Sequence, residues 1–140
     1  MIPFSFRGRR QSLLSAISSA PFFRGGPRTG AALMYVKSNL FSGRSRGRKV
    51  IFVITHDRSY DNVALPAASL RRAGVEVISI GTGRAPSIGQ LRQMAGKRTG
   101  AVFTSSYRTL MSIAKAVQRK ACAGNRCSKS TRGNTHVVQQ

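Results

Sequence analysis

The chain has 140 residues, 41% of them hydrophobic, which suffices for one buried core and favours a single domain. It carries 24 Lys and Arg residues against three acidic residues, Asp57, Asp61 and Glu76, a formal net charge of +21. So few carboxylates nearly exclude catalysis by paired acids, and no apolar run is long enough to span a bilayer.

The N-terminal segment, MIPFSFRGRRQSLLSAISSAPFF, is rich in Arg and Ser and has no acidic residue. This composition resembles a mitochondrial transit peptide, whereas the RGRR run interrupts the apolar core that a secretory signal needs. The alternative that we prefer is a loose start over residues 1–10 followed by a folded helix over 11–20.

A second helix is predicted over residues 29–41, TGAALMYVKSNLF. Leu33, Val36 and Leu40 share one face of it, and Thr29 is the predicted N-cap. The Gly and Pro residues of PFFRGGPR indicate a loop before this helix, and SGRSRGR over 42–48 is typical of a flexible, basic connection.

Strands and helices alternate after this connection. The predicted strands are 50–55, 75–81 and 101–105, and the predicted helices are 62–73, 87–96 and 107–121. The apolar stripe predicted for the last helix consists of Leu110, Ile113, Ala114, Val117 and Ala121. Residues 123–140 are polar without periodicity, which predicts a disordered basic tail.

This alternation predicts an α/β fold, a Rossmann-like parallel sheet with flanking helices. The segment VIFVIT over 50–55 is continuously apolar and β-branched, as expected for a strand in the middle of a sheet. With three predicted strands it lacks a neighbour on one side. Its exposed edge would then allow self-association with a second copy of the chain.

No motif predicts an enzyme. GTGRAP over 81–86 begins like a dinucleotide-binding turn but lacks the third Gly, and no acidic residue follows at the distance that holds a ribose. Ser59, His56 and Asp57 are neighbours in the sequence, without the nucleophile elbow of a hydrolase. We therefore expect no catalytic residues and no cofactor.

Cys122 and Cys127 are the two cysteines of the chain. A local disulfide, a bond to another partner and two free thiols all remain open from the sequence. A zinc site would need further ligands, and His136 is the one histidine nearby.

The positive charge suggests a ligand of its own. A strongly basic chain attracts polyanions such as sulfated glycans or nucleic acid, although a domain that lost its acids one by one would have the same composition. The predicted polyanion-binding residues are those of the basic connection and of the end of the next helix: Arg44, Arg46, Arg48, Lys49, Arg71 and Arg72.

Several segments together resemble a known family. RGGPRTGAALMYV, KVIFVITHDRSYDNV, PAASLRRAGVEVISIGTG and AVFTSSYRTL follow one another as in the later part of a von Willebrand factor type A (vWA) domain of the extracellular matrix type, as in matrilins, cochlin and some collagens. The resemblance covers residues 11–122. It implies a partial domain, because the family's opening strand with Asp-x-Ser-x-Ser, a helix and two further strands have no counterpart here.

The resemblance also implies where a metal would bind. In the family, the metal-ion-dependent adhesion site uses the opening loop, a Thr and an Asp, and the last two correspond here to Pro27 and His56. Asp57 is a candidate substitute ligand. Because Pro cannot supply a side-chain oxygen and Mg²⁺ prefers oxygen ligands, the expected function is metal-independent adhesion to an extracellular matrix protein outside the cell.

Overall fold

The computed structural model describes residues 10–19, 25–41, 47–96, 101–122 and 135–139. The helices are α1 (Arg10–Ser18), α2 (Thr29–Leu40), α3 (Ala64–Arg72), α4 (Ile88–Ala95) and α5 (Leu110–Cys122). The strands are β1 (Lys49–Thr55), β2 (Val75–Thr82), β3 (Val102–Ser105) and β4 (Thr135–Gln139).

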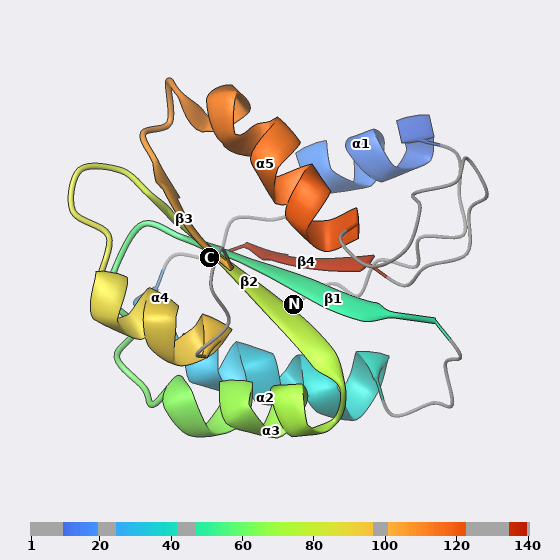
Figure 1. Cartoon of the computed structure of the whole chain (residues 1–140), viewed down its shortest axis with the longest axis vertical. Helices are drawn as coiled ribbons and strands as arrows, with labels where there is room; N and C mark the ends of the chain where they lie inside the picture. Colours follow the sequence, from blue (N-terminus) through green and yellow to red (C-terminus); the bar gives the residue numbers. More distant parts are fainter. Residues whose placement is uncertain (1–9, 20–24, 42–46, 97–100, 123–134, 140) are drawn as a thin grey trace.

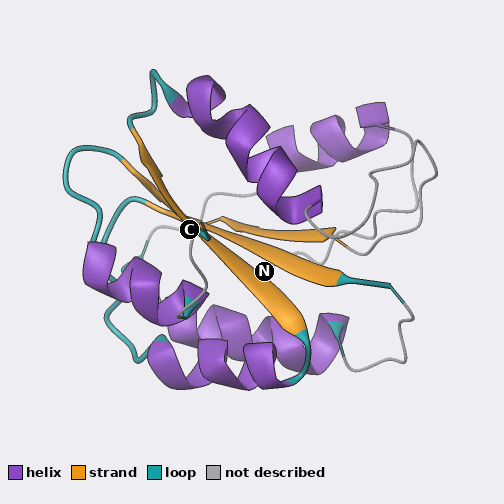
Figure 2. Ribbon diagram, viewed as in Figure 1, coloured by secondary structure: helices purple, strands orange, loops and turns teal. Residues whose placement is uncertain are grey.

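The strands form one parallel sheet in the order β3-β2-β1-β4. Helices cover both faces of it: α2, α3 and α4 lie on one side, and α5 and α1 on the other (Figures 1 and 2). The predicted Rossmann-like α/β fold is confirmed. Within the described residues, no helix combines the length and apolar character that crossing a bilayer requires.

The larger part of the core lies between the sheet and the layer of α2, α3 and α4. Residues of β1 and β2 that pack on this side alternate with residues that pack on the other side, as the pleat of a strand requires. Burial of these apolar side chains is the main favourable contribution to folding. The largest fully buried members of this core are Leu33, Val36, Ile51, Val53, Val63, Leu70, Val77, Leu91 and Met94.

The core on the α5 side is smaller. Val50, Ile78 and Ile80 are buried there, and the apolar stripe of α5 packs against them through Leu110, Ile113, Val117 and Ala121. These four residues belong to the predicted stripe, but its fifth member, Ala114, is exposed. No residue of α5 is fully buried, so this helix covers the sheet with one side and leaves the other to solvent.

The main difference from the sequence prediction is β4. Residues 135–139 were predicted to belong to a disordered tail, and this is wrong, because β4 pairs in parallel with β1 from Val50 to Ile54. The backbone N–H and C=O groups of β1 require partners, and β4 supplies them on the side where a neighbour was predicted to be missing. Residues 123–134 and 140 lie outside the described residues.

The pairing of β4 also changes the prediction of self-association. Both edges of β1 are paired, one with β2 and the other with β4. The exposed edge on which that prediction rested is therefore absent from β1. The predicted loose N-terminus, apart from Arg10 at the start of α1, lies outside the described residues.

Candidate functional site

The candidate site lies where the parallel strands end. The loops that follow β1, β2 and β3 are at this margin, together with the segment that leads into α2, at the left of Figure 1. In open α/β sheets ligands bind at this margin. We call it the carboxyl edge and define it as residues 25–28, 56–63, 83–87 and 106–109.

Two of these segments are tied together by hydrogen bonds. The Tyr60 N–H donates to the Pro27 carbonyl (3.0 Å), and the Ser59 hydroxyl lies 3.1 Å from the same oxygen. The Tyr60 ring lies directly over Gly26, where an added Cβ would come within 1.9 Å of a ring carbon. Gly26 is therefore needed for the close approach of this aromatic ring.

Asp61 caps α2 from the neighbouring segment. Its two carboxylate oxygens accept hydrogen bonds from the backbone N–H groups of Gly30 and Ala31, both at 2.8 Å, and its Oδ1 lies 2.6 Å from the Ser59 hydroxyl. Thr29, the predicted N-cap, is instead the buried first residue of the helix, and its N–H donates to Ser59 Oγ (2.8 Å). The negative charge of Asp61 also complements the helix dipole.

These contacts perturb the ionisation of Asp61. Partial burial raises the pKa of its carboxyl, but the hydrogen bonds from Ser59, Gly30 and Ala31 lower it more, so the pKa lies below its ordinary value. A carboxyl whose pKa is depressed by folding stabilises the folded chain above its unfolded-state pKa. This stabilisation is lost as pH falls through the folded-state pKa.

Asp61→Ala is expected to lower the free energy of unfolding by about 1.5 kcal/mol at pH 7, because two N–H groups at the start of α2 lose their acceptor. The difference from the wild type should shrink below about pH 4, where the unfolded-state carboxyl becomes protonated. Urea denaturation at several pH values measures both effects. The matched control is Asp57→Ala, which removes a carboxylate whose side chain is 65% exposed. Equal losses from both variants would contradict the capping role.

His56 and Asp57 are exposed at the start of the loop. The His56 Nε2 and the Asp57 Oδ2 are 3.0 Å apart. Ser59 is buried, and its hydroxyl contacts Pro27 and Asp61 rather than His56. The three residues considered for hydrolase chemistry are thus not assembled as a triad.

Mg²⁺ needs several oxygen ligands, and most oxygen atoms near the predicted metal positions already accept hydrogen bonds from the protein. The Pro27 carbonyl accepts hydrogen bonds from the Tyr60 N–H and the Ser59 hydroxyl, and both Asp61 oxygens hold the start of α2. Of the two carboxylates in these loops, Asp61 is thus engaged by backbone N–H groups, which leaves Asp57 beside the imidazole of His56. Among the described residues, no group of three or more His, Cys, Asp and Glu side chains is placed to share a metal ion.

The turn GTGRAP has a structural role in this geometry. An added Cβ at Gly81 would come within 2.5 Å of the Pro86 side chain and 2.7 Å of Leu91, so only Gly fits there. Gly83 has a φ of +90°, a conformation that other residues rarely adopt. The turn brings β2 closely back to α4, which fits packing rather than nucleotide binding.

The exposed part of the carboxyl edge is aromatic and basic. Tyr60 is 81% exposed and Tyr107 is 65% exposed. The exposed arginines of these loops include Arg58, Arg84 and Arg108. Sequence reasoning did not select these residues, since they are far apart along the chain and no local motif marks them.

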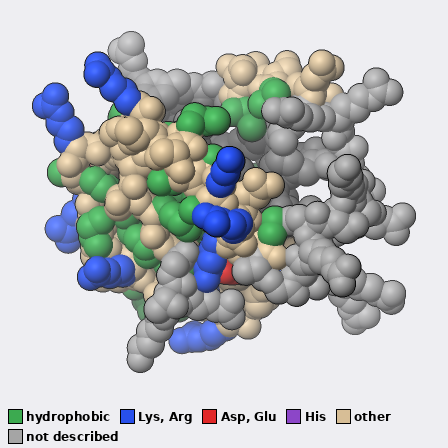
Figure 3. Space-filling view, turned by 45° about the horizontal axis from the view of Figure 1, so that its top comes forward, with side chains coloured by type: hydrophobic (Ala, Val, Ile, Leu, Met, Phe, Trp, Pro, Cys, Tyr) green, Lys and Arg blue, Asp and Glu red, His purple; other side chains and the backbone are tan. Residues whose placement is uncertain are grey.

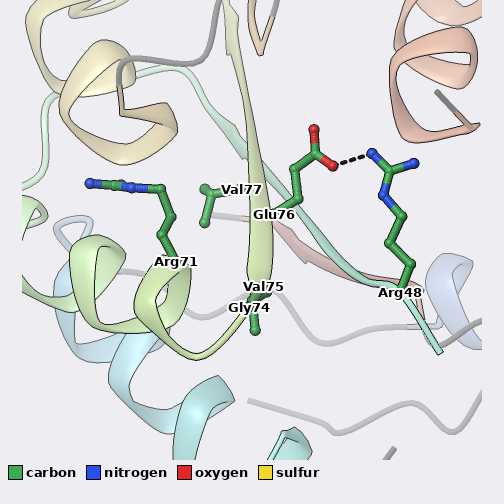
Figure 4. A pocket seen from close by; sticks show the side chains of 6 residues that line it. All are labelled: Arg48, Arg71, Gly74, Val75, Glu76 and Val77. Atoms are coloured by element: carbon green, nitrogen blue, oxygen red, sulfur yellow. Dashed lines mark hydrogen bonds and ion pairs between the residues drawn. The ribbon is translucent and has the colours of Figure 1, made fainter. Parts of the chain in front are cut away.

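Two of the predicted polyanion-binding residues, Arg48 and Arg71, line one cavity, and both guanidinium groups contact other parts of the protein. Arg48 pairs with Glu76 and also donates to the Ala121 carbonyl at the end of α5 (2.5 Å). Arg71 donates to the carbonyls of Gln93 and Met94. Figure 4 shows Arg48 and Arg71 on opposite sides of β2, beside a cavity of about 210 Å³ at the start of that strand.

The remaining members of that set differ in their surroundings. Partial burial, and then the charge of Arg72, lower the pKa of Arg71. Arg72 itself is exposed, and the Lys49 Nζ lies 5.9 Å from the centre of the Phe41 ring. Arg44 and Arg46 lie outside the described residues.

Cys122, the last residue of α5, is disulfide-bonded. The other cysteine of the chain, Cys127, lies outside the described residues. A bond between these two thus remains a prediction.

Comparison with known proteins identifies the family. The family model of the von Willebrand factor type A domain matches residues 2–118. This chain belongs to the von Willebrand factor type A domain family. The resemblance noted from the sequence is therefore confirmed, and the carboxyl edge is the edge of a vWA sheet.

The vWA relatives include proteins of known name. Cochlin from Cavia porcellus is 32% identical over 125 residues, which cover 85% of this chain and 22% of cochlin. Vitrin from Mus musculus is 33% identical over 116 residues, which cover 81% of this chain and 18% of vitrin. The transmembrane cell adhesion receptor mua-3 from Caenorhabditis elegans is 30% identical over 123 residues, which cover 82% of this chain and 3% of the receptor. The chain thus spans about a fifth or less of these relatives.

A similar vWA fold occurs in solved structures. Proximal thread matrix protein 1 from the mussel byssus has a TM-score of 0.73 with 27% identity, covering 80% of this chain and 30% of the other. A second structure of that protein, with a TM-score of 0.74, has a metal-ion-dependent adhesion site (MIDAS motif) occupied by zinc.

Proposed function

We propose that this vWA chain is a non-catalytic protein-interaction module of the extracellular matrix type that binds its partner without a metal ion. The family membership carries the first part of the proposal, because matched relatives include a cell adhesion receptor and a thread matrix protein. An extracellular matrix protein is the proposed partner, and the proposed location is outside the cell.

The second part rests on the donor set of the carboxyl edge. Pro27 and His56 stand at the positions that the family resemblance assigns to metal ligands. The neighbouring oxygens of Pro27 and Asp61 already accept hydrogen bonds from the protein itself. A hard divalent cation needs several free oxygen ligands, and Asp57 with His56 does not supply them. The described residues therefore do not fit a magnesium site.

The carboxyl edge offers a protein partner another kind of contact. Tyr and Arg side chains are enriched at the centres of protein interfaces, where their large surfaces combine apolar contact with hydrogen bonding. Tyr60 and Tyr107 are both exposed here, with Arg58, Arg84 and Arg108 in the same loops. We propose that the two tyrosines are the main contact residues.

Solid-phase binding of the full chain to a panel of purified matrix proteins tests this proposal. Binding to the recognised protein is expected to be equal in EDTA and in Mg²⁺. Tyr60→Ser with Tyr107→Ser should weaken it by about tenfold or more, since interface aromatic residues often contribute over 1 kcal/mol each. Tyr35→Ser, which removes an exposed tyrosine of α2, is the matched control. Loss of binding in EDTA would contradict metal independence, and equal effects of both variants would contradict the assigned surface.

A further inference from the structure

The outward face of α5 carries cations at helical spacing. Arg108 lies just before the helix, and Lys115 and Arg119 follow seven and eleven residues later; all three are exposed. Lys115 and Arg119 are four residues apart within α5 and so lie on one face of it, about 6 Å apart along the axis at 1.5 Å per residue. Arg108 lies in the turn that leads into this helix. We call Arg108, Lys115 and Arg119 the α5 cationic stripe.

No acidic side chain of this chain neutralises the stripe. The three acidic residues are engaged elsewhere: Glu76 pairs with Arg48, Asp57 contacts His56, and Asp61 holds the start of α2. Figure 3 turns the top of Figure 1, where α5 lies, toward the viewer, and Lys and Arg side chains stand out while little acidic surface is visible. The stripe thus presents uncompensated positive charge to solvent.

We propose that the α5 cationic stripe binds a linear sulfated polysaccharide. An extended polyanion can contact successive cations along a helix, and Arg guanidinium groups match sulfate oxygens with two parallel hydrogen bonds. This site goes beyond the proposed protein interaction, because its ligand is a glycan. Apart from Arg108 it also uses a different surface from the carboxyl edge.

Two other polyanions fit the stripe less well. An anionic membrane would need an apolar helix face to insert, but the apolar face of α5 packs against Val50, Ile78 and Ile80 of the sheet. Single-stranded nucleic acid is bound with successive aromatic side chains that stack on its bases, whereas the stripe has one aromatic neighbour, Tyr107 at its N-terminal end, and none over residues 109–119. A sulfated polysaccharide needs neither feature.

The test uses the full chain and a size-defined heparin oligosaccharide, with fluorescence anisotropy at about 0.15 M salt. The triple variant Arg108→Gln, Lys115→Gln, Arg119→Gln is expected to raise Kd about tenfold, because three exposed charge contacts are lost together. Gln keeps helix propensity and a polar side chain while removing the charge. The matched control is Arg58→Gln, Arg72→Gln, Arg92→Gln, which removes the same charge from exposed positions outside the stripe. It should change Kd by less than about twofold.

Desulfated heparin and duplex DNA of similar length complete the experiment. Weak binding of both, relative to heparin, supports a sulfate-specific glycan site. Equal losses in the two triple variants would overturn the stripe, since the charge would then act diffusely. Duplex DNA bound as tightly as heparin would overturn the glycan assignment. Because the protein panel reports on Tyr60 and Tyr107, either proposal can fail while the other stands.

Discussion

Replacing residues 135–139 by alternating Gly and Ser is expected to lower the free energy of unfolding by about 4 kcal/mol. β4 pairs with five residues of β1, Val50 to Ile54, and each backbone hydrogen bond contributes about 1 kcal/mol. Gly also weakens a strand through the entropy of its backbone. Urea denaturation of the purified chain measures the loss.

The same variant should also associate. Without β4, the apolar strand β1 becomes an edge with unpaired N–H and C=O groups, which can pair with another chain. Sedimentation velocity at increasing salt should show dimers or larger species, because salt screens the repulsion between chains of charge +21. The control, His136→Thr with Gln139→Thr, keeps strand propensity and should remain stable and monomeric. A Gly-Ser variant as stable as the wild type would show that β4 does not support β1.

Arg48→Met is expected to lower the free energy of unfolding by about 3 kcal/mol. Glu76 is only 7% exposed, on the side of β2 that faces α5, and its carboxylate pairs with the Arg48 guanidinium. The same guanidinium donates to the carbonyls of Ala121 and Lys120, the last turn of α5, where positive charge is favoured by the helix dipole. Removing Arg48 leaves a buried, uncompensated charge and frees the end of the helix.

Two further variants separate these effects by thermal and urea denaturation. Arg72→Met removes an exposed arginine and should change stability by less than about 0.5 kcal/mol. The double variant Arg48→Met, Glu76→Leu should recover much of the loss, because an apolar pair of similar volume replaces a desolvated ion pair at little cost. If the double variant is as unstable as Arg48→Met, the contact with α5 rather than the buried charge dominates.

Local patterns in the sequence predicted most of the elements. All residues of β2 are buried, those of the apolar strand β1 are buried or half-buried, and the predicted bounds of these strands agree within about one residue. The stripe of α5 was predicted from spacing alone, with Ala114 as the exception. Such patterns succeed because the side-chain period of a strand or helix follows from its backbone geometry, whatever lies around it.

The candidate site was predicted less completely. The order of motifs indicated the vWA family, and the position of the loop after β1 indicated the edge at which a site would lie. The roles of Asp61 and Ser59 were missed, since their partners at the start of α2 are about 30 residues away. Arg48 was predicted to bind a polyanion, but it pairs with Glu76, 28 residues later, and with Ala121, 73 residues later.

The sequence by itself determined the helices α1 to α5 and the strands β1, β2 and β3, the excess of positive charge, and the absence of side-chain oxygens at Pro27 and His56. Only the tertiary structure decided that residues 135–139 form the neighbour of β1, that Asp61 caps α2, and that Arg48 joins β2 to α5. The physical reason is that these contacts satisfy polar groups of one segment with those of a distant one. A periodic pattern indicates which side of a segment is buried. Which group becomes the partner of a hydrogen bond or a charge depends instead on how the whole chain folds.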